Sequence, residues 1–255
     1  MTDDLRQRFG IGCPARFQSP TSTPKPPVRW LAYMISRFLL KLILGVVTKT
    51  HVLHRERTRL AGGWLFVANH ISHFDPPFLT VAALRKLDWM ATRELYHPWP
   101  VALWMHAVDT FPVDRERADR AATRETLARL KRGRVVGIFP EGGIRDGANS
   151  VLEGATLKPG LAGLAQLSGA PVVPCVLIGS DQLYTHRNWI PFRRSEAWIA
   201  FGEPLRIEGE GKDARAAFET RIAEALRALF SELKERFHLT EGDLPQPPAR
   251  RKGRR

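Results

Sequence analysis

Short apolar runs alternate with amphipathic stretches along the middle of the chain. The apolar runs are typical of buried strands and cover residues 64–68, 87–92, 135–139 and 171–179, with a further run from residue 195. The amphipathic stretches between them predict helices at residues 76–84, 98–108, 118–131 and 161–167. Strands that alternate with helices favour an α/β fold with a mostly parallel central sheet flanked by helices.

A longer apolar pattern, at residues 28–47, precedes the first of these strands. It is about as long as a membrane-spanning helix, but a polar stripe recurs along it at steps of four: Arg29, Tyr33, Arg37 and Lys41. Such a stripe favours an amphipathic helix lying in a membrane interface, with Trp30 and Tyr33 at the level of the headgroups. Packing of the apolar face on the protein's own core and a true membrane span are the alternatives.

The remaining segments define the predicted domain organisation. Residues 1–27, rich in Pro, Gly, Ser and Thr, predict a flexible lead-in. Residues 28–240 contain no linker-like break and predict a single domain, with an α/β core at 60–205 and a helix at 213–237 that covers the sheet. Residues 241–255 contain PQPP followed by ARRKGRR and predict a basic, disordered tail.

The formal net charge of +13 indicates an anionic partner. Five of these charges lie in ARRKGRR, so the rest of the chain carries 13 − 5 = +8. Nucleic acid, an anionic membrane surface and a phosphorylated substrate would all satisfy this charge. Only two cysteines occur, Cys13 and Cys175, and the N-terminus lacks the apolar segment of a signal peptide, so a reducing cytoplasmic setting is favoured.

The stretch NHISHFDP, which starts at Asn69, concentrates the chemistry of the chain just after a predicted strand. By itself Asp75 suits a helix N-cap before Pro76, and His70 suits a hydrogen-bonded core histidine. The two side chains can also meet across the strand-to-helix turn, which would leave one imidazole nitrogen free as a general base. A metal site formed by His70, His73 and Asp75 is a third interpretation, for which no comparable histidine cluster elsewhere supplies further ligands.

NHISHFDP resembles the first sequence block of the glycerolipid acyltransferases, in which four residues separate the His from the Asp. Segments that resemble the family's further blocks follow in the same order: DTFPVDR, IFPEGGIR and LKPGLAGLAQLSGAPVVPCVLIGS. The resemblance covers about residues 64–180. The third block departs from the family pattern, because Gly143 and Ile144 precede Arg145, where the family has a Thr directly before the Arg.

The resemblance implies a role for each matching residue. It makes His70 the general base and Asp75 the residue that orients it, with Asn69 and Ser72 as possible support. It also implies a set of substrate-binding residues: Arg115, Glu141, Gly142, Arg145 and Lys158. A structural salt bridge for Glu141 and solvated positions for the cations are the competing interpretations.

The expected enzyme is a peripheral acyltransferase at the cytoplasmic face of a membrane. The resemblance implies transfer of a fatty acyl group from acyl-CoA or acyl carrier protein, as co-substrate, to a lipid hydroxyl, with 1-acylglycerol-3-phosphate as the expected acceptor. No metal and no bound cofactor are expected. A thioesterase or lipid hydrolase using the same pocket, and a basic module that binds nucleic acid, are the alternatives, although the chain has neither a G-x-S-x-G sequence nor a recognisable nucleic-acid-binding motif.

Overall fold

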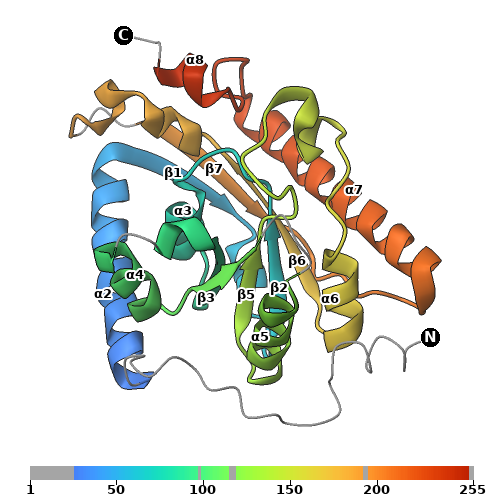
Figure 1. Cartoon of the computed structure of the whole chain (residues 1–255). Coiled ribbons are helices and arrows are strands. Elements are labelled where there is room, and N and C mark those ends of the chain that lie inside the picture. The colour runs from blue at the N-terminus through green and yellow to red at the C-terminus, as the bar shows by residue number, and fades with distance from the viewer. Residues whose placement is uncertain (1–25, 97–98, 115–118, 192–194, 253–255) are drawn as a thin grey trace.

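A computed structural model of the chain describes residues 26–96, 99–114, 119–191 and 195–252 (Figure 1). The described residues form a seven-stranded sheet of order β1-β7-β6-β2-β5-β3-β4. Its strands are β1 (Thr48–Leu53), β2 (Trp64–Ala68), β3 (Leu87–Thr92), β4 (Phe111–Val113), β5 (Val135–Ile138), β6 (Val172–Ile178) and β7 (Ser195–Phe201). Every neighbouring pair is parallel except β6 and β7, which confirms the predicted mostly parallel α/β sheet.

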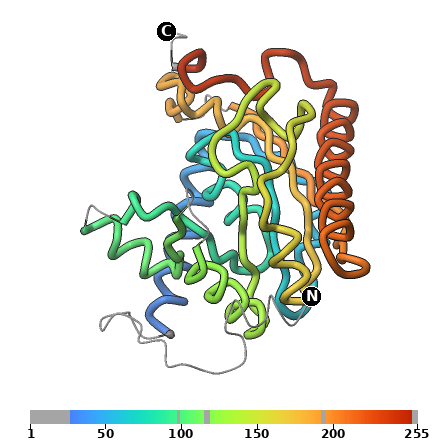
Figure 2. Tube along the Cα trace, turned by 45° about the vertical axis from the view of Figure 1, so that its right-hand side comes forward, coloured from blue at the N-terminus to red at the C-terminus, as the bar shows by residue number. Residues whose placement is uncertain are grey.

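Helices cover both faces of this sheet (Figures 1 and 2). They are α2 (Pro26–Val47), α3 (Asp75–Ala82), α4 (Trp99–Ala107), α5 (Arg120–Lys131), α6 (Leu161–Ser168), α7 (Gly211–Phe237) and the short α8 (Pro248–Lys252). Side chains of α5, α6 and α7 share one hydrophobic core with the sheet, whereas α2 and α3 contribute to a second core on the opposite face. In β2, Leu65 belongs to the first core and Phe66 to the second, which explains its continuous apolar sequence.

Two edge strands were not predicted from the sequence. β1 has the sequence TKTHVL and pairs only with β7, so several of its positions are exposed and its pattern is mostly polar. β4 has only three residues, at the other edge of the sheet. Edge strands bury fewer side chains than central strands, so they leave a weaker hydrophobic signal in the sequence.

Three residues of the polar stripe of α2, Arg29, Tyr33 and Arg37, face the protein, whereas Lys41 and the apolar side of the helix face outward. Tyr33 is only 4% exposed and its hydroxyl accepts a hydrogen bond from Leu87 N, so its expected place at headgroup level is wrong. Arg29 pairs with Asp109 at 3.2 Å. The exposed apolar residues are Val28, Trp30, Leu31, Met34, Ile35, Phe38, Leu39, Leu42 and Ile43. Packing of this apolar surface on the protein's own core is therefore not observed.

The C-terminal segment corrects another prediction. Residues 241–252 are not a disordered tail, because they run back along the protein and end in α8. Arg251 is 5% exposed, and its Nε donates to Asp181 Oδ2 at 2.6 Å. One arginine of the basic C-terminal sequence thus has a buried carboxylate as its partner. Residues 253–255, and residues 1–25 of the predicted lead-in, lie outside the described residues.

A cluster of ion pairs joins α5 to β3 and to the loop before β4. Asp109 accepts from Lys86 at 2.8 Å and also contacts Arg134, while Asp88 pairs with Arg129 at 3.0 Å and with Arg134 at 2.6 Å. Burial by itself would raise the pKa of Asp109, but Lys86, Arg134 and Arg129 lower it to about 2. The charged form of Asp109 therefore stabilises the folded state.

We expect Asp109→Asn to lower the free energy of unfolding by about 2 kcal/mol at pH 7. Because an unfolded aspartate has a pKa of about 3.9, this contribution is complete above about pH 4. It is lost as the pH falls through the folded value of about 2. Urea unfolding of the wild type and the variant at pH 7, 4 and 3 measures the difference.

The matched control is Asp213→Asn, at an exposed aspartate in the first turn of α7, which should change stability by less than about 0.5 kcal/mol. If wild type and Asp109→Asn have the same free energy of unfolding at pH 7, or if their difference grows as the pH is lowered, Asp109 does not stabilise the fold through its charge.

Candidate active site

The loop between β2 and α3 brings His70 and Asp75 into contact. His70 Nδ1 lies 2.7 Å from Asp75 Oδ2, and the two side chains are 7% and 0% exposed. The same carboxylate oxygen accepts from Ile71 N at 2.8 Å and from Ser72 N at 3.0 Å. Asp75 therefore binds groups that precede it in the loop rather than capping α3, whose N-cap position is Phe74.

The contact with Asp75 defines what the imidazole of His70 can do. With Nδ1 held by the carboxylate, the other ring nitrogen, Nε2, makes no hydrogen bond to any residue that the structure describes. His70 also lines a cavity of about 610 Å³. An imidazole that donates from Nδ1 to a carboxylate has an accepting Nε2, which is the arrangement of a general base.

Aromatic rings hold the imidazole from the side. His70 stacks on Phe139 with ring centroids 4.1 Å apart, and Phe139 stacks on Trp89 at 5.0 Å. The Trp89 ring lies directly on the backbone of Gly137 in β5, where an added Cβ would come within 2.6 Å of the ring. Gly137 thus makes room for the stack that supports His70.

Glu141, in the loop that follows β5, supports the same loop of His70 and Asp75. Its carboxylate is buried and accepts from His70 N at 2.6 Å, from Val151 N at 2.8 Å and from Ser150 Oγ at 3.0 Å. Burial raises the pKa of Glu141, and these hydrogen bonds only partly offset that effect. The structure places the carboxylate against protein groups, so its contact with an acceptor hydroxyl stays a prediction.

The remaining residues of the first block also hold the loop. Asn69 exchanges two hydrogen bonds of 2.9 Å with the backbone of Leu177 in β6, through both polar atoms of its side chain. The buried Ser72 accepts a hydrogen bond from Phe74 N at 3.0 Å. These contacts are structural support for the positions of His70 and Asp75.

The predicted cations are spread around the site. Arg145 donates its backbone N–H to His70 O at 2.8 Å, and its side chain is half-buried. Lys158 lies beside Gly142, whose backbone φ is 71° and whose added Cβ would meet the Lys158 side chain at 2.7 Å. Arg115 lies outside the described residues.

A second cavity, of about 580 Å³, contains cations that the sequence analysis did not single out. Lys158 lines it together with Arg120 from α5 and Arg215 from α7, and none of these three forms an ion pair with a described residue. Asp114 and Asp119 are its acidic lining residues, and Asp119 pairs with Arg93 at 3.1 Å. Arg120 and Arg215 belong to no motif, so only their convergence in space reveals them.

The cavity beside His70 is mostly apolar and lies between α2, α3 and α4. Its apolar lining includes Leu40, Leu95, Trp104, Met105 and Val108, and it shares Phe139 with the cationic cavity. α4 also exposes Trp99 at 76% and Leu103 at 57%, an outward apolar face that the sequence analysis did not predict. Trp104 of α4 donates to Ser36 of α2 at 3.2 Å.

A buried His–Asp pair thus lies at the strand ends of an α/β sheet, beside an apolar cavity and a cationic one, which is where open α/β sheets bind their ligands. Residues 49–178 match the family described as Acyltransferase, about half of the chain. The chain therefore belongs to this acyltransferase family, as the resemblance predicted.

Individual relatives agree with this assignment. The chain is 27% identical over 197 residues to a 1-acyl-sn-glycerol-3-phosphate acyltransferase of Bacillus subtilis, covering 77% of this chain and 92% of that one. A Streptococcus pneumoniae protein of the same name is 26% identical, over 68% of this chain and 61% of its own length. The crystal structure of the 1-acyl-sn-glycerophosphate acyltransferase PlsC from Thermotoga maritima has the same fold, with a TM-score of 0.65 and 20% identity over 91% of this chain and 88% of that one.

We expect Gly137→Ala to displace Trp89 and disturb the stack on Phe139 and His70. Overpacking of this kind costs about 1–3 kcal/mol of stability, measured by urea unfolding. Gly45→Ala is the matched control, because an added Cβ there meets nothing within 4 Å. It lies on α2, where alanine favours the helix. A Gly137→Ala variant as stable as the wild type would show that the Trp89 ring does not need the space above Gly137.

Proposed function

We propose that this protein transfers a fatty acyl group from acyl-CoA or acyl carrier protein to the hydroxyl of 1-acylglycerol-3-phosphate. The observation that carries the proposal is the His70–Asp75 contact at the edge of an apolar cavity. The names of the relatives support the acceptor, and the acyltransferase family supports the reaction class.

His70 acts as the general base in this reaction. Nε2 takes the proton of the acceptor hydroxyl as its oxygen attacks the thioester carbonyl carbon, and collapse of the tetrahedral intermediate breaks the C–S bond. The thiolate of the donor leaves and is protonated by the imidazolium. Asp75 orients the imidazole and stabilises its positive charge, and the activated thioester requires neither a metal nor a covalent enzyme intermediate.

The two cavities suit the two ends of the lipid substrates. A volume of about 610 Å³ with a mostly apolar lining accommodates acyl chains beside His70. The cavity of about 580 Å³ offers Lys158, Arg120 and Arg215 to phosphate, in addition to the predicted contacts from Arg115 and Arg145. Gly142 allows a close approach to the backbone at the same cavity, and Glu141 is proposed to contact an acceptor hydroxyl.

Membrane attachment is proposed through the outward faces of α2 and α4. Among the described residues, α2 alone is long and apolar enough to cross a membrane, which by itself is weak evidence of membrane association. Its inward Arg29, Tyr33 and Arg37 and its exposed apolar side suit a helix lying in the interface at the cytoplasmic leaflet. The net charge of +13 adds attraction to anionic lipids.

The reaction is tested by thiol release from palmitoyl-CoA with and without 1-acylglycerol-3-phosphate. We expect release that requires the acceptor and that falls by about 10²- to 10⁴-fold in a folded His70→Ala variant, because the base is lost. His186→Ala, at an exposed histidine in a surface turn, is the matched control and should keep full activity.

Each other outcome has a definite meaning. Release that does not need an acceptor identifies a thioesterase, and full activity in His70→Ala removes His70 as the base. If neither palmitoyl-CoA nor palmitoyl carrier protein supports acceptor-dependent release, the proposed function is wrong.

Membrane attachment is tested by co-sedimentation with vesicles of anionic phospholipid. We expect Phe38→Asp in α2 and Leu103→Asp in α4 each to weaken binding several-fold, because each places a charge in an apolar surface. The matched control is Ala216→Asp at an exposed position of α7, on the other side of the sheet (Figure 2). Equal loss in all three variants would show that net charge alone governs binding.

A further inference from the structure

The second carboxylate oxygen of Asp75 has a partner that no sequence motif indicated. Asp75 Oδ2 is occupied by His70, Ile71 N and Ser72 N, whereas Oδ1 accepts a hydrogen bond from Ser180 Oγ. Both side chains are fully buried. Among the described residues, Ser180 is the only hydrogen-bond partner of Oδ1, so its removal would leave a buried carboxylate oxygen unpaired.

Ser180 is held in place by the turn that it begins. It is the first residue of a short 3-10 helix, η5 (Ser180–Tyr184), which follows β6 directly. Gly179 makes the turn with a φ of 91°, and an added Cβ there would collide with the carbonyl oxygen of Glu196. The hydroxyl of Ser180 therefore reaches Asp75 from a backbone with little freedom to shift.

η5 contacts the loop of His70 and Asp75 at a second place. The Tyr184 hydroxyl accepts from His73 N at 3.1 Å, and its ring packs against Phe74 with centroids 5.5 Å apart. Ser180 and Tyr184 lie at opposite ends of η5, so this short helix contacts the loop at Asp75 with one end and at His73 and Phe74 with the other.

The C-terminal segment fixes η5 from the other side. Asp181, fully buried next to Ser180, accepts from Arg251 Nε at 2.6 Å and from Gln246 N at 3.1 Å. Thr185 Oγ1 donates to Arg251 O at 3.0 Å. The two outer nitrogens of Arg251 donate to the carbonyl oxygens of Gly242 and Leu244, which binds the segment to itself.

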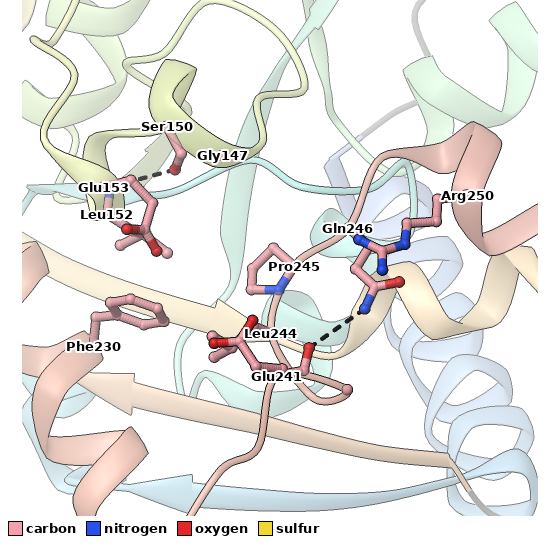
Figure 3. A pocket seen from close by; sticks show the side chains of 11 residues that line it. Gly147, Ser150, Leu152, Glu153, Phe230, Glu241, Leu244, Pro245, Gln246 and Arg250 are labelled. Carbon is pink, nitrogen blue, oxygen red and sulfur yellow. Dashed lines mark hydrogen bonds between the residues drawn. The ribbon is translucent and has the colours of Figure 1, made fainter.

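The C-terminal segment also borders a pocket beside the turn that holds Glu141, the second carboxylate that supports the loop of His70 and Asp75. Figure 3 shows Gln246 and Arg250 on one side of a pocket of about 280 Å³, with the turn that carries Ser150 on the other. Ser150 Oγ is one of the groups that donate to Glu141, whose carboxylate also accepts from His70 N.

We propose that Ser180 is a positioning residue for the His70–Asp75 pair and that the C-terminal segment fixes it through the Asp181–Arg251 ion pair. The proposal rests on the proposed function, in which this pair supplies the base. Ser180 does not bind substrate. Its hydroxyl holds Oδ1, so that Oδ2 stays directed at His70 Nδ1 and Nε2 stays free to accept a proton.

The first test compares Ser180→Ala with Ser180→Thr in the full chain. We expect Ser180→Ala to lower kcat about tenfold, the loss typical of one hydrogen bond to a charged group, with KM changed less than about twofold. In 15N NMR spectra of the free enzyme, the His70 nitrogens should change from protonated Nδ1 with bare Nε2 to a mixture of tautomers. Ser180→Thr, which keeps a hydroxyl, should retain the wild-type kcat and the wild-type nitrogen signals.

A second pair of variants avoids a substitution next to Asp75. Arg251→Ala removes the ion-pair partner of Asp181, and Arg250→Ala removes the neighbouring exposed arginine, which forms no hydrogen bond or ion pair with Asp181. We expect only Arg251→Ala to lower kcat and to alter the His70 nitrogen signals. This comparison also decides the matter if Ser180→Ala does not fold.

The outcomes separate this inference from the proposed function. The NMR signals of His70 need no substrate, so they test positioning even if no acyl transfer is found. Unchanged His70 nitrogens and unchanged kcat in both Ser180→Ala and Arg251→Ala would overturn the inference and leave acyl transfer untouched. A loss confined to thermal stability, with kcat per folded enzyme unchanged, would likewise make these residues merely structural.

Discussion

The buried carboxylate of Asp75 is the group on which the site depends. A carboxylate inside a protein is costly unless its oxygens accept hydrogen bonds, and here four donors surround it. Two of them are backbone N–H groups of its own loop, so Asp75 closes the turn and orients His70 with the same oxygen. The shape of the loop and the chemistry of the imidazole therefore have one common cause.

The sheet brings the supports of this carboxylate together. β6, β2 and β5 are neighbours and run parallel, so their carboxyl ends lie at one edge of the sheet. His70 follows β2, Glu141 follows β5 and Ser180 follows β6. One polar side chain therefore follows each of the three strands, and all three lie close to the His70–Asp75 pair.

The two cavities beside His70 differ in polarity. On one side α2 and α4 enclose an apolar cavity and present apolar side chains outward. On the other side Lys158, Arg120 and Arg215 line a cavity that also contains Asp114 and Asp119, and none of the three cations forms an ion pair with a described residue. Phe139 borders both cavities and stacks on His70. The proposed reaction requires this division, because its lipid substrates combine acyl chains with phosphate.

The sequence by itself determined the central strands and the His70–Asp75 pair. The central strands are buried on both faces, so each has a continuous apolar sequence: β2, β3, β5 and β6. His70 and Asp75 are only five residues apart at the same strand-to-helix turn, so a short motif records their contact. Only the tertiary structure decided that Tyr33 faces inward, that Arg251 is buried and that Ser180 reaches Asp75. Ser180 and Asp75 are 105 residues apart and Arg251 and Asp181 are 70 apart, so no local pattern of hydrophobic and polar residues records these contacts.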